Sequence, residues 1–200
     1  MKKRLLVIES HSDDSAIGAQ GMIRKLIKQD YEAYFVVIAV GDTSFHHCGV
    51  VTSDKRLEEY ENYMKRIGGI WLNDVFPLHE EARLDRYEMR LLVGKIEKII
   101  YSVNPDILIC QAPSFHQDHT ATYEATIAAI RPTVRECPRE ILLMENPTYV
   151  HSLGPSTDFR PTTYCELTQE EMDEKFRCFV ECFPSQVRGE GNCLSPEGIR

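Results

Sequence analysis

The chain alternates short apolar runs with longer amphipathic stretches, and this alternation constrains its fold most strongly. The apolar runs predict strands and the stretches between them predict helices. The strands are expected over residues 4–9, 34–40, 106–110 and 140–144, and the helices over residues 16–28, 57–67, 84–103 and 118–130. Regular β-α alternation is typical of a parallel sheet covered by helices on both faces. The sequence therefore predicts an α/β fold, a Rossmann-like three-layer sandwich with a mostly parallel sheet.

The size and charge of the chain narrow the class of protein. Its 200 residues, 42% of them hydrophobic, suffice for one domain with a sizeable core, and no linker-like stretch divides them. We expect a single domain over residues 1–200. A net charge of −8 argues against broad binding to nucleic acids or anionic membranes.

The N-terminus and the cysteines indicate the cellular compartment in which the protein is expected. Four apolar residues separate the initial Met-Lys-Lys-Arg from Glu9, too few for the core of a signal peptide, and no stretch has the length of a membrane span. Seven scattered cysteines fit reduced thiols better than a disulfide framework. We therefore expect a cytoplasmic protein without a membrane span.

Two short segments hold the densest clusters of metal-binding and acid/base residue types. Residues 11–14 (HSDD) follow the first predicted strand, and residues 116–119 (HQDH) follow the strand at 106–110. In an open parallel sheet the loops after the strands share the carboxyl edge, where ligands bind. The two clusters can therefore meet in space, and two imidazoles with a carboxylate fit an open zinc site.

Each cluster also has a purely structural interpretation. Aspartates beside a helix start often serve only as N-caps, because their oxygens accept the free amide hydrogens of the first turn. Histidines three residues apart can also occur by chance in a solvated loop. Both segments follow predicted strands and both stand at helix starts, which favours a shared site over two coincidences.

Other common site motifs are missing from the sequence. The segment from Gly18 to Gly21 lacks Gly-x-Gly-x-x-Gly spacing, and no glycine loop ends in Gly-Lys-Ser/Thr. No Gly-x-Ser-x-Gly elbow of a serine hydrolase occurs either. Close packing of a helix on the sheet explains these glycines better than a nucleotide site does.

Beyond the two clusters, longer segments of the chain carry a resemblance to a known family. Residues 8–26 (IESHSDDSAIGAQGMIRKL) join the first cluster to a glycine-containing helix start, and residues 175–186 (KFRCFVECFPSQ) form a helix ending in Ser-Gln. With the second cluster, His-x-Asp-His, the chain resembles the PIG-L/LmbE family of zinc-dependent N-acetylglucosaminyl deacetylases over roughly residues 4–186. One departure concerns Ser15, which stands where the family commonly has glutamate.

The resemblance implies a Zn²⁺ cofactor and its ligands. It places the metal ligands at His11, Asp14 and His119. Zinc lowers the pKa of bound water to about 7, and the resemblance implies that Asp13 takes the proton of the attacking water as a general base. The missing glutamate at Ser15 removes a carboxylate that would support the metal ligands.

The second motif supplies the remaining catalytic candidates. A protonated His116, oriented by Asp118, would stabilise the tetrahedral oxyanion, and losing such a donor typically costs roughly 3 kcal/mol of transition-state stabilisation. Either Asp13 or His116 could protonate the leaving amine, and the sequence leaves this open. Arg56 matches a family position that can reach substrate, and Asp42 follows a strand at the same edge of the sheet, so both are candidate substrate-binding residues.

The resemblance implies removal of the N-acetyl group from a small molecule, an N-acetylated amino sugar or its conjugate of GlcNAc type. Two other functions stay open: a zinc-dependent amide or ester hydrolase with a non-sugar substrate, and a non-catalytic sugar-binding module of the same fold. Asp13 and His116 argue against the module, because binding alone requires neither a base nor an oxyanion donor. The sequence implies no nucleic-acid partner and leaves room for a homo-oligomer.

Overall fold

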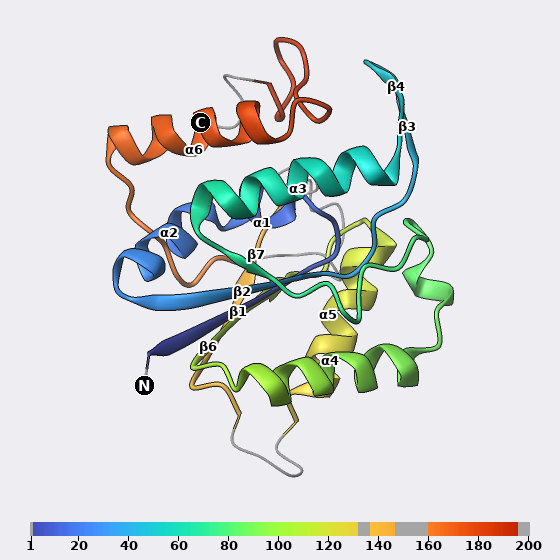
Figure 1. The fold of residues 1–200 in the computed structure, drawn as a ribbon, viewed down its shortest axis with the longest axis vertical. Coiled ribbons are helices and arrows are strands. Elements are labelled where there is room, and N and C mark those ends of the chain that lie inside the picture. The colour runs from blue at the N-terminus through green and yellow to red at the C-terminus, as the bar shows by residue number, and fades with distance from the viewer. Residues whose placement is uncertain (1, 132–136, 147–159, 196–200) are drawn as a thin grey trace.

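A computed structural model of the protein describes residues 2–131, 137–146 and 160–195 (Figure 1). Its centre is a five-stranded sheet in the order β5-β2-β1-β6-β7, in which every neighbouring pair is parallel. The strands are β1 (Lys3–Glu9), β2 (Tyr31–Val37), β5 (Ile70–Trp71), β6 (Ile107–Gln111) and β7 (Glu140–Met144). The predicted α/β fold with a parallel sheet is confirmed.

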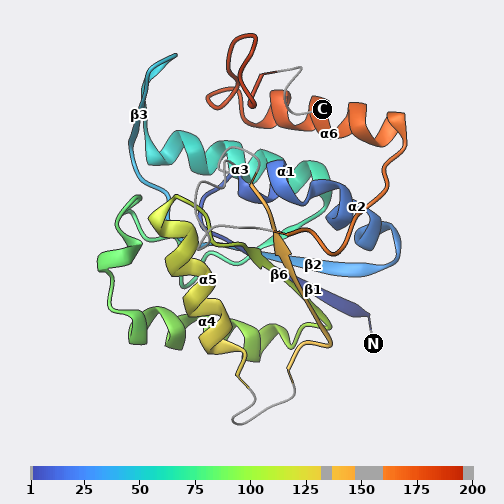
Figure 2. The ribbon, with the colours of Figure 1, turned by 180° about the vertical axis from the view of Figure 1, so that it is seen from behind.

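Helices cover both faces of this sheet (Figures 1 and 2). One face carries α1 (Asp14–Gly18), α2 (Gln20–Lys28), α3 (Ser53–Ile67) and α6 (Gln169–Cys182), and the other carries α4 (Met89–Val103) and α5 (Gln117–Ala129). Alternate residues of β1 enter separate cores: Leu5 and Val7 pack under α1–α3 and α6, whereas Leu6 and Ile8 pack under α4 and α5. Since both faces are buried, β1 is a continuous apolar run rather than an alternating one.

Several helix boundaries differ from the predicted ranges. The helix expected over 16–28 is broken at Ala19, whose φ of −135° separates α1 from α2. The helix expected over 84–103 begins as a 3₁₀ turn, η1 (Leu84–Arg86), and α4 starts only at Met89. Helix α3 starts earlier than expected because Thr52 caps it by accepting a hydrogen bond from the amide of Lys55.

The strand expected over 34–40 is β2, which begins and ends three residues earlier. After Val37 the chain leaves the regular ladder: Ile38 donates to the Glu9 carbonyl and Val40 donates to the carbonyl of Leu78. Strand β5 and a short antiparallel hairpin, β3 (Thr43–Phe45) and β4 (Gly49–Val51), were not predicted. Runs of two or three residues are too short to show a period.

The sheet order brings the two sequence clusters together. Strands β1 and β6 are neighbours, with Leu5 opposite Ile107 and Ile8 opposite Cys110. The loop after β1 leads into α1 on one face, and the loop after β6 leads into α5 on the other (Figures 1 and 2). This divergence creates the crevice in which open α/β sheets bind ligands. Within the described ranges, no helix is both long and apolar enough to cross a membrane.

Candidate functional site

A small cavity of about 80 Å³ lies at the carboxyl edge of β1 and β6. Five of the predicted site residues line it: His11, Asp13, Asp14, Arg56 and His116. Two more, Asp118 and His119, are fully buried and contact these residues. The structure thus brings together two clusters that are distant in the sequence, since 107 positions separate His11 from Asp118.

Three histidines converge in this cavity. The ligand nitrogens of His11, His116 and His119 all lie within 4.8 Å of one another. Asp14 faces two of these rings, with Oδ1 3.3 Å from Nε2 of His119 and Oδ2 3.7 Å from Nδ1 of His11. Imidazole nitrogens with one carboxylate are the donor set that zinc accepts, so the residues present fit a zinc ion.

In both His11 and His119, the ring nitrogen that does not face Asp14 contacts another side chain. Nε2 of His11 lies 3.1 Å from Oδ2 of Asp118. Nδ1 of His119 lies 2.7 Å from Oγ of Ser114 and 3.3 Å from Nε2 of Gln111. Metal-binding histidines are typically fixed in this way through the nitrogen that does not bind the metal. The other nitrogens, Nδ1 of His11 and Nε2 of His119, are those that face Asp14.

Asp14 is a fixed carboxylate. Its Oδ2 accepts the backbone N–H of His11 at 2.9 Å, and its Oδ1 accepts the side-chain amide of Asn146 at 2.9 Å. Burial by itself would raise the pKa of Asp14, but His119 and His11 together hold it well below its usual range. Asp14 is therefore charged and rigidly oriented, as a metal ligand must be.

Asp13 differs from its neighbour. It precedes α1, yet its side chain makes no capping hydrogen bond, so the N-cap interpretation fails here. Among the described residues its carboxylate has no hydrogen bond or ion pair, and it lines the cavity. Burial and the adjacent Asp14 charge raise its pKa. Asp13 is thus a carboxylate with no hydrogen bond or ion pair among the described residues and with a raised proton affinity. These are the properties of a general base.

The PIG-L family, described as GlcNAc-PI de-N-acetylase, matches residues 6–130, which is more than half of the chain and includes both clusters. The protein belongs to the PIG-L family. Comparison with curated protein sequences finds no match.

Solved structures extend this PIG-L likeness at the level of the fold. A triple mutant of the deacetylase of the teicoplanin biosynthetic pathway has a TM-score of 0.74 at 18% identity, covering 96% of this chain and 87% of that one. The N,N'-diacetylchitobiose deacetylase of Pyrococcus horikoshii has a TM-score of 0.65 at 19% identity, covering 90% and 70%. The 4-carboxy-2-hydroxymuconate hydratase GalB of Pseudomonas putida has a TM-score of 0.66 at 18% identity, covering 92% and 80%. One fold therefore carries different named activities.

The second motif of this PIG-L protein is arranged differently from the prediction. Asp118 does not orient His116: its carboxylate faces His11 and accepts the amides of Ala82 at 2.6 Å and Leu84 at 2.9 Å. The pairing fails because residues two apart at a helix start point in different directions.

His116 itself is the N-cap of α5. Its Nδ1 accepts the backbone N–H of Asp118 at 3.2 Å. Burial, together with the neighbouring His11 and His119, lowers the pKa of His116 to about 4. The predicted protonated imidazole is therefore wrong for this structure. The neutral ring, with Nδ1 accepting, carries its proton on Nε2.

The two predicted substrate-binding residues have different surroundings. Arg56 lines the cavity but is 2% exposed, and it contacts Glu81, the carbonyl of Gly41 and Oγ1 of Thr43. Asp42 does not line the cavity, because its Oδ1 accepts the amide of Ser53 at the start of α3. The structure gives Asp42 a structural role at this helix start.

Glu9 is a buried residue of the site that sequence reasoning missed. Its Oε2 accepts the backbone N–H of Ser15 at 2.8 Å, and its Oε1 accepts the hydroxyl of Tyr60 at 2.5 Å. Burial raises the pKa of Glu9 to about 8. Its carboxyl thus holds the backbone of Ser15, directly after Asp14. An acidic residue at the end of an apolar strand was the available signal.

Glu81 and Asn146 were also missed. Glu81 pairs with Arg56, and Asn146 binds Asp14 from 132 residues away in the sequence. Neither belongs to a motif, so only the folded chain brings them to the cavity.

Proposed function

We propose that this PIG-L family protein is a zinc-dependent N-deacetylase of N-acetylated amino sugars or their conjugates, of GlcNAc type. The observation that carries the proposal is the carboxylate of Asp13, which lies beside the histidine cluster without a hydrogen-bond partner among the described residues. A sugar-binding module needs no such group. A hydrolase needs it to take a proton from water.

The proposed zinc ligands are His11, Asp14 and His119. Support comes from the ring nitrogens that face Asp14, because the opposite nitrogens are occupied by Asp118 and Ser114. When bound, zinc would supply a Lewis acid that polarises an acyl oxygen and makes water more acidic.

Side chains of the protein itself would transfer the proton and stabilise the negatively charged oxygen. Asp13 takes the proton from the attacking water, and its raised pKa makes it a better acceptor than an exposed aspartate. The same Asp13 then passes this proton to the leaving amine. Neutral His116 donates from Nε2 to the oxygen that becomes negative, and such a donor contributes roughly 2.7–4 kcal/mol to the transition state.

The dimensions of the cavity favour a short acyl group. Its volume of about 80 Å³ holds an acetyl group, with the amine-bearing part of the substrate outside at the mouth. Two structurally similar proteins are named as deacetylases, of N,N'-diacetylchitobiose and in teicoplanin biosynthesis. The name of the diacetylchitobiose enzyme, with the family description GlcNAc-PI de-N-acetylase, supports an amino sugar as the substrate class.

The first experiment measures amine release by the zinc-loaded protein over a panel of N-acetyl sugars, with N-acetylated amino acids as non-sugar substrates. We expect turnover of at least one sugar, loss of turnover on chelation, and loss in Asp13→Asn. A matched control is Asp30→Asn, far from the cavity, where asparagine also tolerates the positive φ of 66°. Turnover confined to non-sugar amides would favour the alternative hydrolase, and undiminished turnover in Asp13→Asn would contradict the mechanism.

A second experiment separates ligands from base by metal analysis. The wild-type protein and Asp13→Asn should each bind about one zinc per chain, whereas His11→Ala and His119→Ala should lose most of it. Full occupancy in both histidine variants would refute the ligand assignment. Zinc binding without any amide turnover would favour another activity on this fold, such as that of the hydratase.

A further inference from the structure

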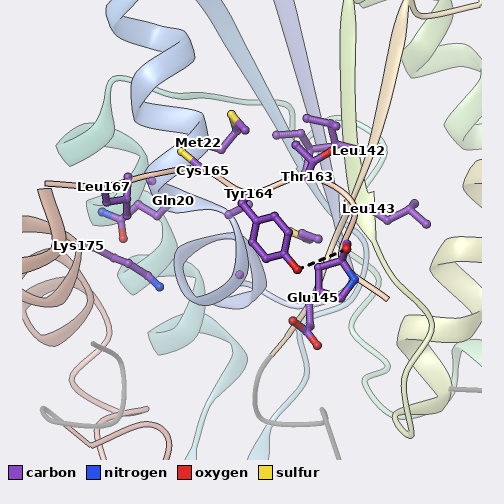
Figure 3. Close-up of a pocket in the computed structure, with 16 residues that line it drawn as sticks. Gln20, Met22, Leu142, Leu143, Glu145, Thr163, Tyr164, Cys165, Leu167 and Lys175 are labelled. Atoms are coloured by element: carbon purple, nitrogen blue, oxygen red, sulfur yellow. Dashed lines mark hydrogen bonds between the residues drawn. The ribbon is translucent and has the colours of Figure 1, made fainter. Parts of the chain in front are cut away.

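A second, larger cavity lies where the end of α1 and the start of α2 meet β7 (Figure 3). Its volume is about 310 Å³, at the lower end of the roughly 300–1,000 Å³ of small-molecule sites. The two cavities share no lining residue. Between them Gly18 touches the chain at Glu145 so closely that an added Cβ would lie 2.3 Å from the carbonyl oxygen.

One wall of this cavity is apolar and the rest of its lining is polar. Met22 of α2, Leu142 and Met144 of β7, and Leu167 line it, and the ring of Tyr164 stands across its middle (Figure 3). The Tyr164 hydroxyl donates to the carbonyl of Pro161 at 3.5 Å, and the side chain is 80% exposed, so the ring forms the open side of the cavity. The apolar wall suits the apolar body of a ligand.

One end of the cavity carries a positive charge. Lys175 reaches from α6 toward the side on which Tyr164 stands (Figure 3). An acidic residue of the same helix, Glu171, pairs with Lys25 and Lys28. Lys175, in contrast, makes no ion pair with any described residue. Burial also lowers its pKa. A half-buried ammonium that has no counter-ion within the described ranges leaves room for an anionic group.

The start of α2 adds to this positive end. Gln20 and Gly21, the first residues of this nine-residue helix, line the cavity, and the N-cap residue Ala19 supplies no side-chain bond to the first turn. Helix N-termini attract anions through their free amides and the helix dipole. Gln20 is 0% exposed, and neither its Oε1 nor its Nε2 has a hydrogen-bond partner among the described residues. Buried amides are rarely left in this state.

We propose that this cavity binds a small organic monocarboxylate with an apolar body. Its carboxylate would lie at the end formed by Lys175, Gln20 and the start of α2, and its body would lie along Tyr164 and the aliphatic walls. Glu145 lines the opposite side, with β7 (Figure 3). Its negative charge fixes the orientation, because the carboxylate of a ligand is repelled from that end. The site does not depend on the proposed deacetylase activity.

Calorimetric titration of the intact protein with 4-phenylbutyrate tests this site. Chelator is present, so that zinc in the candidate active site cannot hold the carboxylate. We expect saturable binding, and binding of the uncharged 4-phenylbutyramide about tenfold weaker or less, because only the acid pairs with the ammonium. Equal affinities for acid and amide, or no saturable binding of the acid, would overturn the proposal.

Three variants locate the binding. Lys175→Met should weaken the acid about tenfold, whereas Lys98→Met, the same change on the exposed surface of α4, should leave it unaltered. Thr163→Trp fills the cavity from an exposed position and should abolish binding of both acid and amide. Thermal melting establishes that each variant is folded. Wild-type affinity in folded Lys175→Met or in folded Thr163→Trp would refute the assignment.

Discussion

Replacing Glu9 by leucine should destabilise the protein through the donors that it leaves behind. In the structure the Glu9 carboxyl accepts the Ser15 amide at 2.8 Å and the Tyr60 hydroxyl at 2.5 Å, and both donors lose their acceptor in the variant. An unsatisfied buried donor costs about 1–3 kcal/mol, so the two together cost about 2–6 kcal/mol. Leucine also removes a carboxyl whose burial is unfavourable, which places the expected net loss near the lower bound, about 2 kcal/mol.

Two further variants test whether the loss of stability arises from the two unsatisfied donors. Glu9→Gln should cost less than about 1 kcal/mol, since the amide can accept from Ser15 through its oxygen and donate to the Tyr60 hydroxyl through its nitrogen. The double variant Glu9→Leu/Tyr60→Phe removes one of the two orphaned donors. It should therefore be more stable than Glu9→Leu alone, by about 1–3 kcal/mol.

The assay is urea unfolding followed by circular dichroism, with chelator present so that metal binding does not add to the free energy of unfolding. Tyr60→Phe alone is measured to complete the double-mutant cycle. Strictly additive losses in the double variant, or a stability of Glu9→Leu equal to that of wild type, would show that these hydrogen bonds do not hold the residue after Asp14.

Three other changes should have measurable effects. Gly18→Ala should destabilise the fold by more than 1 kcal/mol in chemical unfolding, since its Cβ would meet the Glu145 carbonyl at 2.3 Å, and an unchanged midpoint would contradict this packing. Thr168→Ala removes the capping box of α6 and should cost about 1 kcal/mol in the same assay, whereas no loss would mean that the cap is not formed in solution. Under native conditions a thiol reagent should modify exposed Cys48 quickly and Cys110 only on unfolding, because burial raises the pKa of the Cys110 thiol to about 12. The modification rates are measured by mass spectrometry of peptides. Equal rates for the two cysteines would contradict this prediction.

The fold was predictable because its main elements are long and strongly patterned. The apolar runs of β1, β6 and β7 and the helical period of α5 appear in the sequence within one or two residues of their ends. Ala19 was not predictable as a break, since alanine favours helix. The hairpin of β3 and β4 is likewise too short for any periodicity.

The site was predictable where a motif carries it and not elsewhere. His11, Asp14 and His119 meet as expected, because each follows a strand that ends at the same edge of the sheet. The roles within the second motif could not be read from adjacency, since the backbone turns Asp118 away from His116. Glu81 and its partners depend on contacts between distant segments, which no local pattern encodes.

The position of β1 in the middle of the sheet has a consequence for how the chain is made. Its pairing with β2 needs only the first 37 residues, but its other edge waits for β6, where Leu5 meets Ile107. During synthesis a ribosome must therefore add some seventy more residues while one edge of the central strand has no neighbour. An open strand edge of this kind is prone to aggregation. We therefore expect the nascent chain to aggregate most readily in the interval between the emergence of β2 and that of β6.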